Sequence, residues 1–186
     1  MQLRNNRPQI VQNTYTKNSI LLFLPASNFS EEEYQIINRV FARAGKQVFI
    51  SSDSSSVCNG ERGMKVKADI DYFNVNEKNF AAIVLIGGKG SREYWDNEHL
   101  HRIVKRFKSS GKIVSAICSA PIILARAGLL SKISATCWFE DKNELLKLGV
   151  QYQDRNLVVD NNILTANGPR SAEQFAESVI NMTKGN

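Results

Sequence analysis

Short, almost uninterrupted apolar runs recur along this chain and constrain its fold more than any other feature. They occupy residues 19–24, 81–86 and 113–117, and each gives way to small or turn-forming residues. A run of this length, bounded by turn residues, is typical of a strand that is buried on both faces of a parallel sheet. The chain therefore predicts a sheet that is covered on both sides.

Helical patterns lie between the predicted strands. Ser30 and Glu33 have the spacing of a capping box, and an apolar helical stripe follows them as far as Gly45. Further helices are predicted over 96–109, 140–148 and 171–182. Another is predicted to follow residues 118–121 directly and to end near residue 128. Further strands are predicted over 47–51, 150–152, 157–160 and 163–165, with a loop over 52–63 and hairpin strands around 64–68. Alternating strands and helices predict an α/β fold: a three-layer α/β/α sandwich with a mostly parallel, flavodoxin-like sheet.

The length and composition fit one globular domain. Of the 186 residues, 42% are hydrophobic and 23% are charged, which is ordinary for a chain with a buried core. We assign residues 19–186 to this domain and residues 1–18 to a polar extension. The extension faintly resembles an organellar transit peptide but lacks the apolar core of a secretory signal, and no run approaches the roughly 20 apolar residues that span a bilayer. We therefore expect a cytoplasmic protein without membrane contact.

The charge and the metal-binding residue types exclude several function classes. The net charge of +6 would attract anions or nucleic acid. However, the densest basic run, over residues 102–112, lies opposite the apolar stripe of a predicted helix, which favours a solvated surface over a nucleic-acid site. Three cysteines without a CxxC spacing and two histidines elsewhere indicate neither a disulfide framework nor a zinc site. We expect no metal, no cofactor and no nucleic-acid partner.

The segment after the third apolar run has the pattern of a nucleophile elbow. Residues 116–120 read AICSA and place Cys118 between alanines, as a sharp strand-to-helix turn requires, and Pro121 suits the first turn of a helix. A thiol there faces the positive end of the helix dipole, so we expect a stabilised thiolate and the most readily oxidised of the three cysteines. Cys58 lies in the predicted polar loop and Cys137 at a strand end. The alternative is that Cys118 is a small buried hydrophobic residue.

The exits of the other two apolar runs also carry unusual residues. Ligands of open α/β sheets bind beyond the carboxyl ends of the strands, where these exits converge. Gly87 and Gly88 follow the second run, and their N–H groups could form an oxyanion hole with that of Ser119, although most glycine pairs are plain turns. Glu33 follows the first run and could serve such a site or complete the capping box. The local sequence favours capping.

Five strings resemble the DJ-1/PfpI superfamily, in the same order, over about residues 19–185. GKIVSAICSAPIILARAGLL resembles its nucleophile segment, FAAIVLIGGKG its glycine turn and GERGMKVKADI its hairpin region. LTANGPRSAEQFAESVI resembles its closing strand, glycine-proline loop and helix. PASNFSEEEY has the layout of its first loop, with Glu33 where the essential glutamate of the superfamily falls.

This resemblance implies roles for five residues. Cys118 would be the nucleophile, and Glu33 the carboxyl group that hydrogen-bonds its sulfur. The N–H groups of Gly88 and Ser119 would be the donors to an oxyanion. Arg62 falls where the superfamily places a residue that reaches toward the site of a partner subunit. The resemblance therefore also implies a homodimer.

The sequence departs from the superfamily where the chemistry would depend on histidine. PfpI-type peptidases have a histidine directly after the nucleophile, but this chain has Ser119, so the Cys-His pair of peptide hydrolysis is absent. His99 and His101 are predicted to be surface residues. DJ-1-type members place a histidine and an arginine near the cysteine, and in this chain those two positions are occupied by Cys137 and Asn167. Cys137 is then either a second thiol near the site or a core residue.

Two functions of different classes fit these residues. In the first, Cys118 adds to a small reactive carbonyl, such as a 2-oxoaldehyde or its protein adduct, and Glu33 shuttles the proton, in line with the glyoxalase and deglycase-like activities of the superfamily. In the second, the chain is a non-catalytic, redox-responsive or chaperone-like stress protein whose Cys118 is oxidised to a sulfinate. A cysteine peptidase or amidase is the least favoured. The expected partner is a small carbonyl substrate or an oxidant.

Overall fold

The computed structural model describes residues 15, 19–53 and 57–184, so the predicted extension over 1–18 lies almost wholly outside the described residues. The strands are β1 (Ser19–Phe23), β2 (Ser27–Phe29), β3 (Gln47–Ser52), β4 (Val57–Gly60), β5 (Lys65–Lys67), β6 (Ile70–Asp71), β7 (Ala82–Leu85), β8 (Ile113–Ile117), β9 (Ser134–Ala135), β10 (Gln151–Tyr152), β11 (Leu157–Asp160) and β12 (Ile163–Ala166). The α-helices are α1 (Glu31–Arg43), α2 (Glu98–Ser109), α3 (Pro121–Arg126), α4 (Lys142–Lys147) and α5 (Ala172–Lys184). Short 3₁₀ helices are formed by Tyr72–Asn74, Glu77–Asn79, Lys89–Tyr94, Phe139–Asp141 and Pro169–Ser171.

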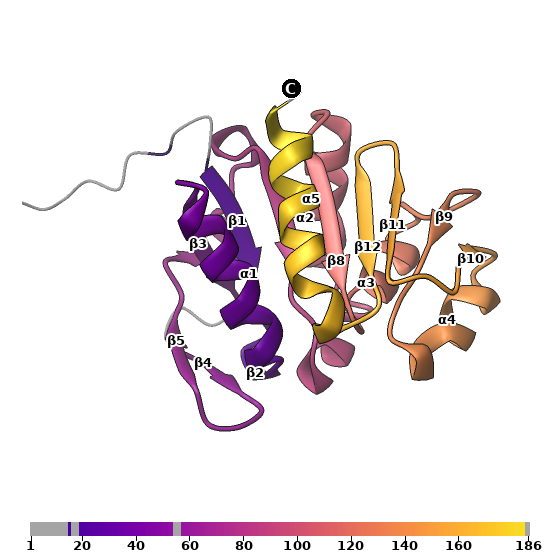
Figure 1. Ribbon diagram of the computed structural model, residues 1–186, viewed down its shortest axis with the longest axis horizontal. Coiled ribbons are helices and arrows are strands. Elements are labelled where there is room, and N and C mark those ends of the chain that lie inside the picture. The colour runs from indigo at the N-terminus through magenta and orange to yellow at the C-terminus, as the bar shows by residue number, and fades with distance from the viewer. Residues whose placement is uncertain (1–14, 16–18, 54–56, 185–186) are drawn as a thin grey trace, which may run out of the picture.

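The main sheet contains seven strands in the order β11-β12-β8-β7-β1-β3-β6. β11 runs antiparallel to β12, and all the other neighbouring strands of this sheet are parallel. Helices α1 and α5 pack together on one face, and α2 and α3 pack together on the other (Figure 1). The predicted three-layer α/β/α sandwich with a mostly parallel sheet is therefore confirmed.

Strand β1 lies inside the main sheet, between β7 and β3, and its sequence does not alternate between apolar and polar residues. Ile20 and Leu22 belong to the apolar cluster that includes α1 and α5, whereas Leu21 and Phe23 belong to the cluster that includes α2 and α3. All four side chains are buried. Because helices cover both faces, the four positions after Ser19 are all apolar.

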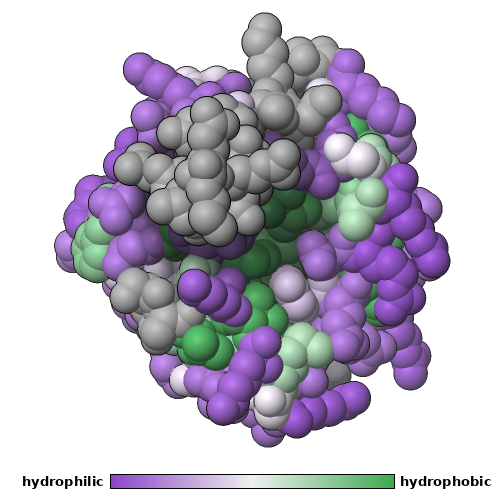
Figure 2. Space-filling view, turned by 90° about the vertical axis from the view of Figure 1, so that its left-hand side faces the viewer, coloured by the Kyte–Doolittle hydropathy of each residue, from purple (hydrophilic) through white to green (hydrophobic). Residues whose placement is uncertain are grey.

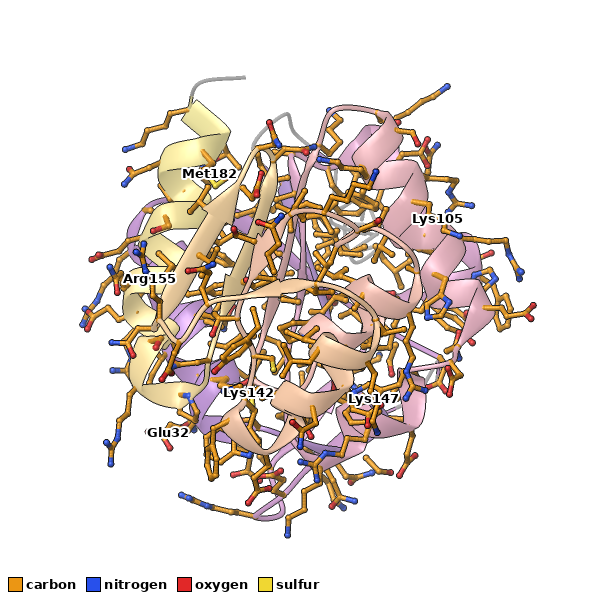
Figure 3. All side chains as sticks on the ribbon, turned by 90° about the vertical axis from the view of Figure 1, so that its right-hand side faces the viewer. Glu32, Lys105, Lys142, Lys147, Arg155 and Met182 are labelled. Atoms are coloured by element: carbon orange, nitrogen blue, oxygen red, sulfur yellow. The ribbon has the colours of Figure 1, made fainter. Side chains whose placement is uncertain are left out.

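Helix α2 carries the basic run on its outer side, as predicted. Its N-cap is Asn97, whose side chain accepts a hydrogen bond from the N–H of Leu100. Its buried residues are Leu100, Ile103, Val104 and Phe107, while Arg102, Lys105 and Arg106 are exposed. Figure 3 shows Lys105 pointing outward from this helix. Arg106 also forms an ion pair with Glu77 at 3.2 Å, so part of this positive charge is neutralised within the chain.

The segment that was predicted as a loop over 52–63 is partly a strand. β4 pairs antiparallel with β5 and parallel with β2, forming a small separate sheet. Cys58 lies in β4 and is fully buried, so its predicted placement in a polar loop is wrong.

Strands β2, β6 and β9 have only two or three residues and are partly exposed, so the apolar pattern gives little sign of them. On the side that Figure 2 shows, hydrophilic residues surround a hydrophobic area.

The carboxyl ends of the parallel strands position the candidate site. β1, β7 and β8 are adjacent and parallel, so their ends meet at one edge of the sheet, the lower edge in Figure 1. β7 leads into Gly87, β8 leads into Cys118, and α1 begins nearby after β2. None of the helices in the described part of the chain has the length and apolar character that a membrane-spanning segment needs.

Candidate active site

Cys118 lies on a sharp turn between β8 and α3. Its φ angle of 63° is in the left-handed region, which side chains other than glycine rarely adopt and which costs about 1 to 3 kcal/mol. Two backbone hydrogen bonds hold the turn: the N–H of Cys118 donates to Ala166 O at 2.9 Å, and the N–H of Trp138 donates to Cys118 O at 2.8 Å. Ala116 and Ala120 are fully buried. The strained backbone and its small neighbours are those of a nucleophile elbow.

The carboxyl group of Glu33 points into the interior and does not cap its own helix. Ser30 is the N-cap of α1, and its side chain accepts from the N–H of Glu33. However, the N–H of Ser30 donates to Gly87 O at 2.9 Å, and Oε2 of Glu33 accepts from the N–H of Gly87 at 2.9 Å. The return bond of a capping box is therefore not formed, and the interpretation of Glu33 as a capping side chain is wrong.

The backbone of Gly87 lies against both the cysteine and the glutamate. A Cβ atom at residue 87 would lie 2.5 Å from Cys118 Cβ and 2.9 Å from Glu33 Oε2. At Gly88, φ is 104°, and a Cβ atom would collide with Ser30 N and lie 2.5 Å from Asn28 O. Such contacts exclude any side chain. The glycine pair is thus required for the close approach of three segments, not only for a turn.

Burial raises the pKa of Glu33 to about 8. The side chain is fully buried, and Oε1 has no hydrogen-bond partner among the described residues. The negative charges of Glu61 and Glu32 raise this pKa further, while the hydrogen bond from Gly87 and the interaction with Cys118 lower it. At neutral pH the carboxyl group therefore carries a proton and can donate it.

Burial also raises the pKa of the Cys118 thiol, and the negative charge of an ionised Glu33 raises it further. Hydrogen bonds from the N–H of Gly88 and from Ser119 act in the opposite direction without outweighing burial. The expected stabilisation of a thiolate in the resting protein is therefore wrong, because Cys118 is only 8% exposed and burial outweighs the hydrogen bonds to its sulfur. The contribution of Glu33 disappears when this residue is protonated, so the two groups titrate as a coupled pair.

The site opens into a pocket of about 330 Å³. Its walls come from the three strand exits and from two later loops. The lining residues are Ser30, Glu33, Glu61, Gly88, Lys89, Arg92, Cys118, Ser119, Trp138, Glu140 and Pro169. The structure thus brings together four of the five predicted site residues. Arg62 is exposed and does not line this pocket of its own chain, which leaves its predicted role toward a partner subunit as a prediction.

Sequence reasoning missed the charged rim and the aromatic wall of this pocket. Oε1 of Glu61 accepts from the N–H of Lys89 at 2.8 Å, and Arg92 forms an ion pair with Asp141 at 2.9 Å. Lys89 directly follows the glycine turn, so its position offered a signal. Trp138 directly follows Cys137, one of the two positions that the resemblance placed near the cysteine, and its N–H donates to Cys118 O.

Cys137 and Asn167 lie on a second pocket of about 490 Å³. Cys137 is fully buried, and its Sγ donates to Trp138 O at 3.2 Å. Burial raises the pKa of its thiol to about 12. The side chain of Asn167 is held by Asn156 at 3.2 Å and by Ser171 at 2.6 Å. Cys137 is therefore a core residue rather than a second thiol in the pocket of Cys118.

Neither histidine takes part in the candidate site. The ring of His99 contacts Tyr72 O at 3.2 Å, and the ring of His101 contacts Trp95 O at 2.8 Å. Both are half-buried on α2 rather than free at the surface. Within the described residues, no cluster of three or more histidine, cysteine or acidic side chains could hold a metal ion.

Comparison with known proteins decides the family. The model of the DJ-1/PfpI family matches residues 18–182. The chain belongs to this family. It is 30% identical to the protein named deglycase PfpI of Pyrococcus furiosus, over 88% of this chain and 99% of that one. It is 27% identical to a glutathione-independent glyoxalase of Caenorhabditis elegans, over 90% of this chain and 89% of that one.

A solved structure agrees with this assignment. The ThiJ/PfpI domain protein of Brachyspira murdochii superimposes with a TM-score of 0.88 and 32% sequence identity, covering 91% of this chain and 98% of that chain. The resemblance that the sequence strings indicated is thus confirmed over nearly the whole described domain. The protein is thus a DJ-1/PfpI family member that has an α/β sandwich and a nucleophile elbow.

Proposed function

We propose that this DJ-1/PfpI family member is an enzyme that converts small 2-oxoaldehydes to 2-hydroxy acids, with Cys118 as the nucleophile. One observation carries the proposal. The thiol of Cys118 lies beside a buried carboxyl group, Glu33, whose pKa is raised to about 8. Such a group can give and take a proton at physiological pH, which is what addition to a carbonyl requires.

The proposed reaction needs only the substrate and water. The sulfur forms a bond with the aldehyde carbon, and the carbonyl oxygen takes up a proton, which gives a hemithioacetal. The hydrogen on that carbon then moves as a proton to the neighbouring carbonyl carbon through an enediol, which gives a thioester of a 2-hydroxy acid. Water cleaves the thioester, releases the acid and restores the thiol. One carbon is oxidised while its neighbour is reduced, so no external oxidant or reductant is consumed.

The residues of the pocket divide this work. The ionised form of Glu33, which a pKa of about 8 keeps accessible at physiological pH, takes the thiol proton as Cys118 attacks and passes it to the carbonyl oxygen. Glu33 is then a carboxylate again and accepts the proton that moves between the two carbons. The proposed donors to the developing oxyanion are the N–H groups of Gly88 and Ser119. In the resting protein the N–H of Gly88 donates to the sulfur of Cys118. The pocket volume of about 330 Å³ suits a small carbonyl compound.

The names of the relatives agree with this chemistry. A deglycase and a glyoxalase both act on reactive carbonyls or their adducts, and the two relatives with these names match this chain over most of its length. A peptidase has less support, because neither histidine lines the pocket and Ser119 stands where PfpI-type peptidases have their histidine. We expect no cleavage of casein by the freshly purified protein.

The test is turnover of methylglyoxal, followed by the appearance of lactate. Cys118→Ala should abolish turnover, and Glu33→Gln should lower kcat by about 100-fold or more, the contribution typical of a general acid–base. Cys137→Ala, which alters a buried thiol outside the Cys118 pocket, is the matched control and should retain activity. Absence of lactate with the wild-type protein, or unchanged turnover in Cys118→Ala, would overturn the proposal.

A second function, peroxide sensing, has one specific observation in its favour. Oε1 of Glu33 is buried without a hydrogen-bond partner among the described residues, and in the protonated acid this oxygen could donate to a sulfinate oxygen on Cys118. Each peroxide molecule would transfer one oxygen atom to the sulfur and leave as water, in two steps from thiol to sulfinate. Lactate formation that is catalytic and needs no oxidant supports the enzyme, whereas a response that requires oxidised Cys118 supports the sensor.

A further inference from the structure

The Cys118 pocket and the second pocket share one wall. Trp138 and Pro169 line both of them, while Cys118 lines only the first and Cys137 only the second. The first pocket measures about 330 Å³ and the second about 490 Å³. Figure 3 shows Glu32, which lines the second pocket, at the same end of the molecule as Lys142 at the start of α4. The larger volume thus adjoins the pocket of the reactive thiol across a wall formed by Trp138 and Pro169, of which Trp138 has the larger side chain.

The indole of Trp138 is held in this position from several directions. The backbone N–H of Trp138 donates to Cys118 O at 2.8 Å, which ties its segment to the elbow. A Cβ atom at residue 168 would lie 3.1 Å from Cε3 and 3.2 Å from Cζ3 of the ring, so Gly168 gives the indole its space. The ring of Phe139 packs against the indole with the centroids 4.7 Å apart. The wall is therefore a packed element rather than a freely moving side chain.

The second pocket is lined by both apolar and charged side chains. Its inner walls are formed by Cys137, Trp138 and Tyr152, which are buried or half-buried. Its charged lining residues, Glu32, Asp154 and Arg170, are exposed and therefore lie toward solvent. An apolar, partly aromatic interior with a polar rim suits a bulky aryl or alkyl group.

We propose that Trp138 is the residue that sets the size of the carbonyl substituent that can reach Cys118. This inference rests on the proposed function for its substrate class. With the indole in place, the substituent is confined to the smaller pocket, and small 2-oxoaldehydes are preferred. Removal of the indole joins the two volumes and admits a large aryl group beside the thiol.

The first test does not depend on turnover. Iodoacetamide and N-(1-naphthyl)iodoacetamide share one reactive group and differ in size, and peptide mapping reports their rates at Cys118 separately from those at the other cysteines. In Trp138→Ala the naphthyl-to-parent rate ratio should rise by about tenfold or more, the scale of discrimination by a shaped apolar pocket. The iodoacetamide rate itself should change less than about twofold, since a general loosening of the elbow would raise both rates.

Two further variants keep the result interpretable. Tyr152→Ala enlarges only the second pocket and should leave the rate ratio near the wild-type value, because Tyr152 does not line the Cys118 pocket. Trp138→Leu retains an apolar filler and should give an intermediate ratio even if Trp138→Ala fails to fold. An unchanged ratio in folded Trp138→Leu and Trp138→Ala, or an equal rise in Tyr152→Ala, would overturn the assignment of Trp138 as the wall.

The second test uses turnover of methylglyoxal and 4-biphenylglyoxal. Trp138→Ala should raise the ratio of kcat/KM for the biphenyl substrate to that for methylglyoxal by about tenfold or more. If the wild-type protein turns over neither aldehyde, the proposed function fails and the alkylation ratio alone decides the role of Trp138. If turnover is found and its selectivity is the same in wild type and Trp138→Ala, the inference fails and the proposed function stands.

Discussion

The buried carboxyl group of Glu33 and the thiol of Cys118 interact directly beside Gly87 and shift each other's pKa. Burial raises both values, the interaction with Cys118 lowers that of Glu33, and the charge of Glu33 raises that of Cys118. Ionisation of either group therefore makes ionisation of the other less favourable. This coupling makes the stability, the oxidation chemistry and the proposed catalysis of the protein depend on the same pair.

The first prediction concerns the pH dependence of stability. Glu33 ionises near 4.5 in a solvated chain but only near 8 in the folded protein. Its contribution to the free energy of unfolding is thus fully present below pH 4.5 and is lost as the pH rises toward 8. Relative to Glu33→Gln, the wild-type protein should lose up to about 1.4 kcal/mol per pH unit within this window. Urea unfolding of both proteins between pH 5 and pH 9 measures the difference.

The control for this experiment is Glu32→Gln, which removes an exposed carboxyl group one residue away. It should leave most of the pH dependence of the wild-type protein in place, because the charge of Glu32 is the weakest of the named influences on the pKa of Glu33. A difference between wild type and Glu33→Gln that stays constant with pH would contradict the raised pKa of Glu33.

The second prediction concerns Gly88. Gly88→Ala should lower the free energy of unfolding by about 2 to 4 kcal/mol, because the new Cβ atom would press on the backbone of Ser30 and Asn28 at a positive φ angle. Gly45→Ala is the matched control: φ is 69°, but nothing lies within 4 Å of the added carbon. It should cost only about 1 kcal/mol. Equal losses in the two variants, measured by urea unfolding, would show that close approach at Gly88 is unimportant.

The third prediction concerns the order of oxidation. Cys118 is 8% exposed and lines a pocket, whereas Cys58 and Cys137 are fully buried. Graded peroxide should therefore modify Cys118 first, as intact mass and peptide mapping would report. Glu33→Gln retains a hydrogen-bond donor and should still hold the sulfinate, while Glu33→Leu should not. Equal oxidation of the three cysteines, or the same pattern in both variants, would count against this role of Glu33.

The fourth prediction is a homodimer. It rests on membership of the family and on the exposed position of Arg62, whose backbone N–H donates to Glu31 Oε1 at 2.7 Å while its side chain is absent from the Cys118 pocket of its own chain. Light scattering at micromolar concentration should give twice the chain mass of 20.9 kDa. A monomer at this concentration would contradict the prediction and leave Arg62 without a partner site to reach.

The sequence by itself determined the layers, the parallel strands and the elbow. The runs at 19–24, 81–86 and 113–117 are apolar except for Ser19 and Ser115 because helices cover both faces of the sheet, and this requirement is visible in each strand separately. The elbow at Cys118 was equally local, since the small residues on either side of it are neighbours in the chain. Family resemblance then placed Glu33 beside Cys118, against the local reading of a helix cap.

Only the tertiary structure decided where side chains point when their partners are far away in sequence. Glu33 turns inward because its acceptor oxygen meets the N–H of Gly87, 54 residues later, and a local pattern carries no sign of that contact. The burial that raises the pKa of Cys118 and the wall that Trp138 forms likewise come from segments brought together by folding. Local sequence specifies propensity and periodicity, whereas desolvation and pocket shape depend on the whole packed chain.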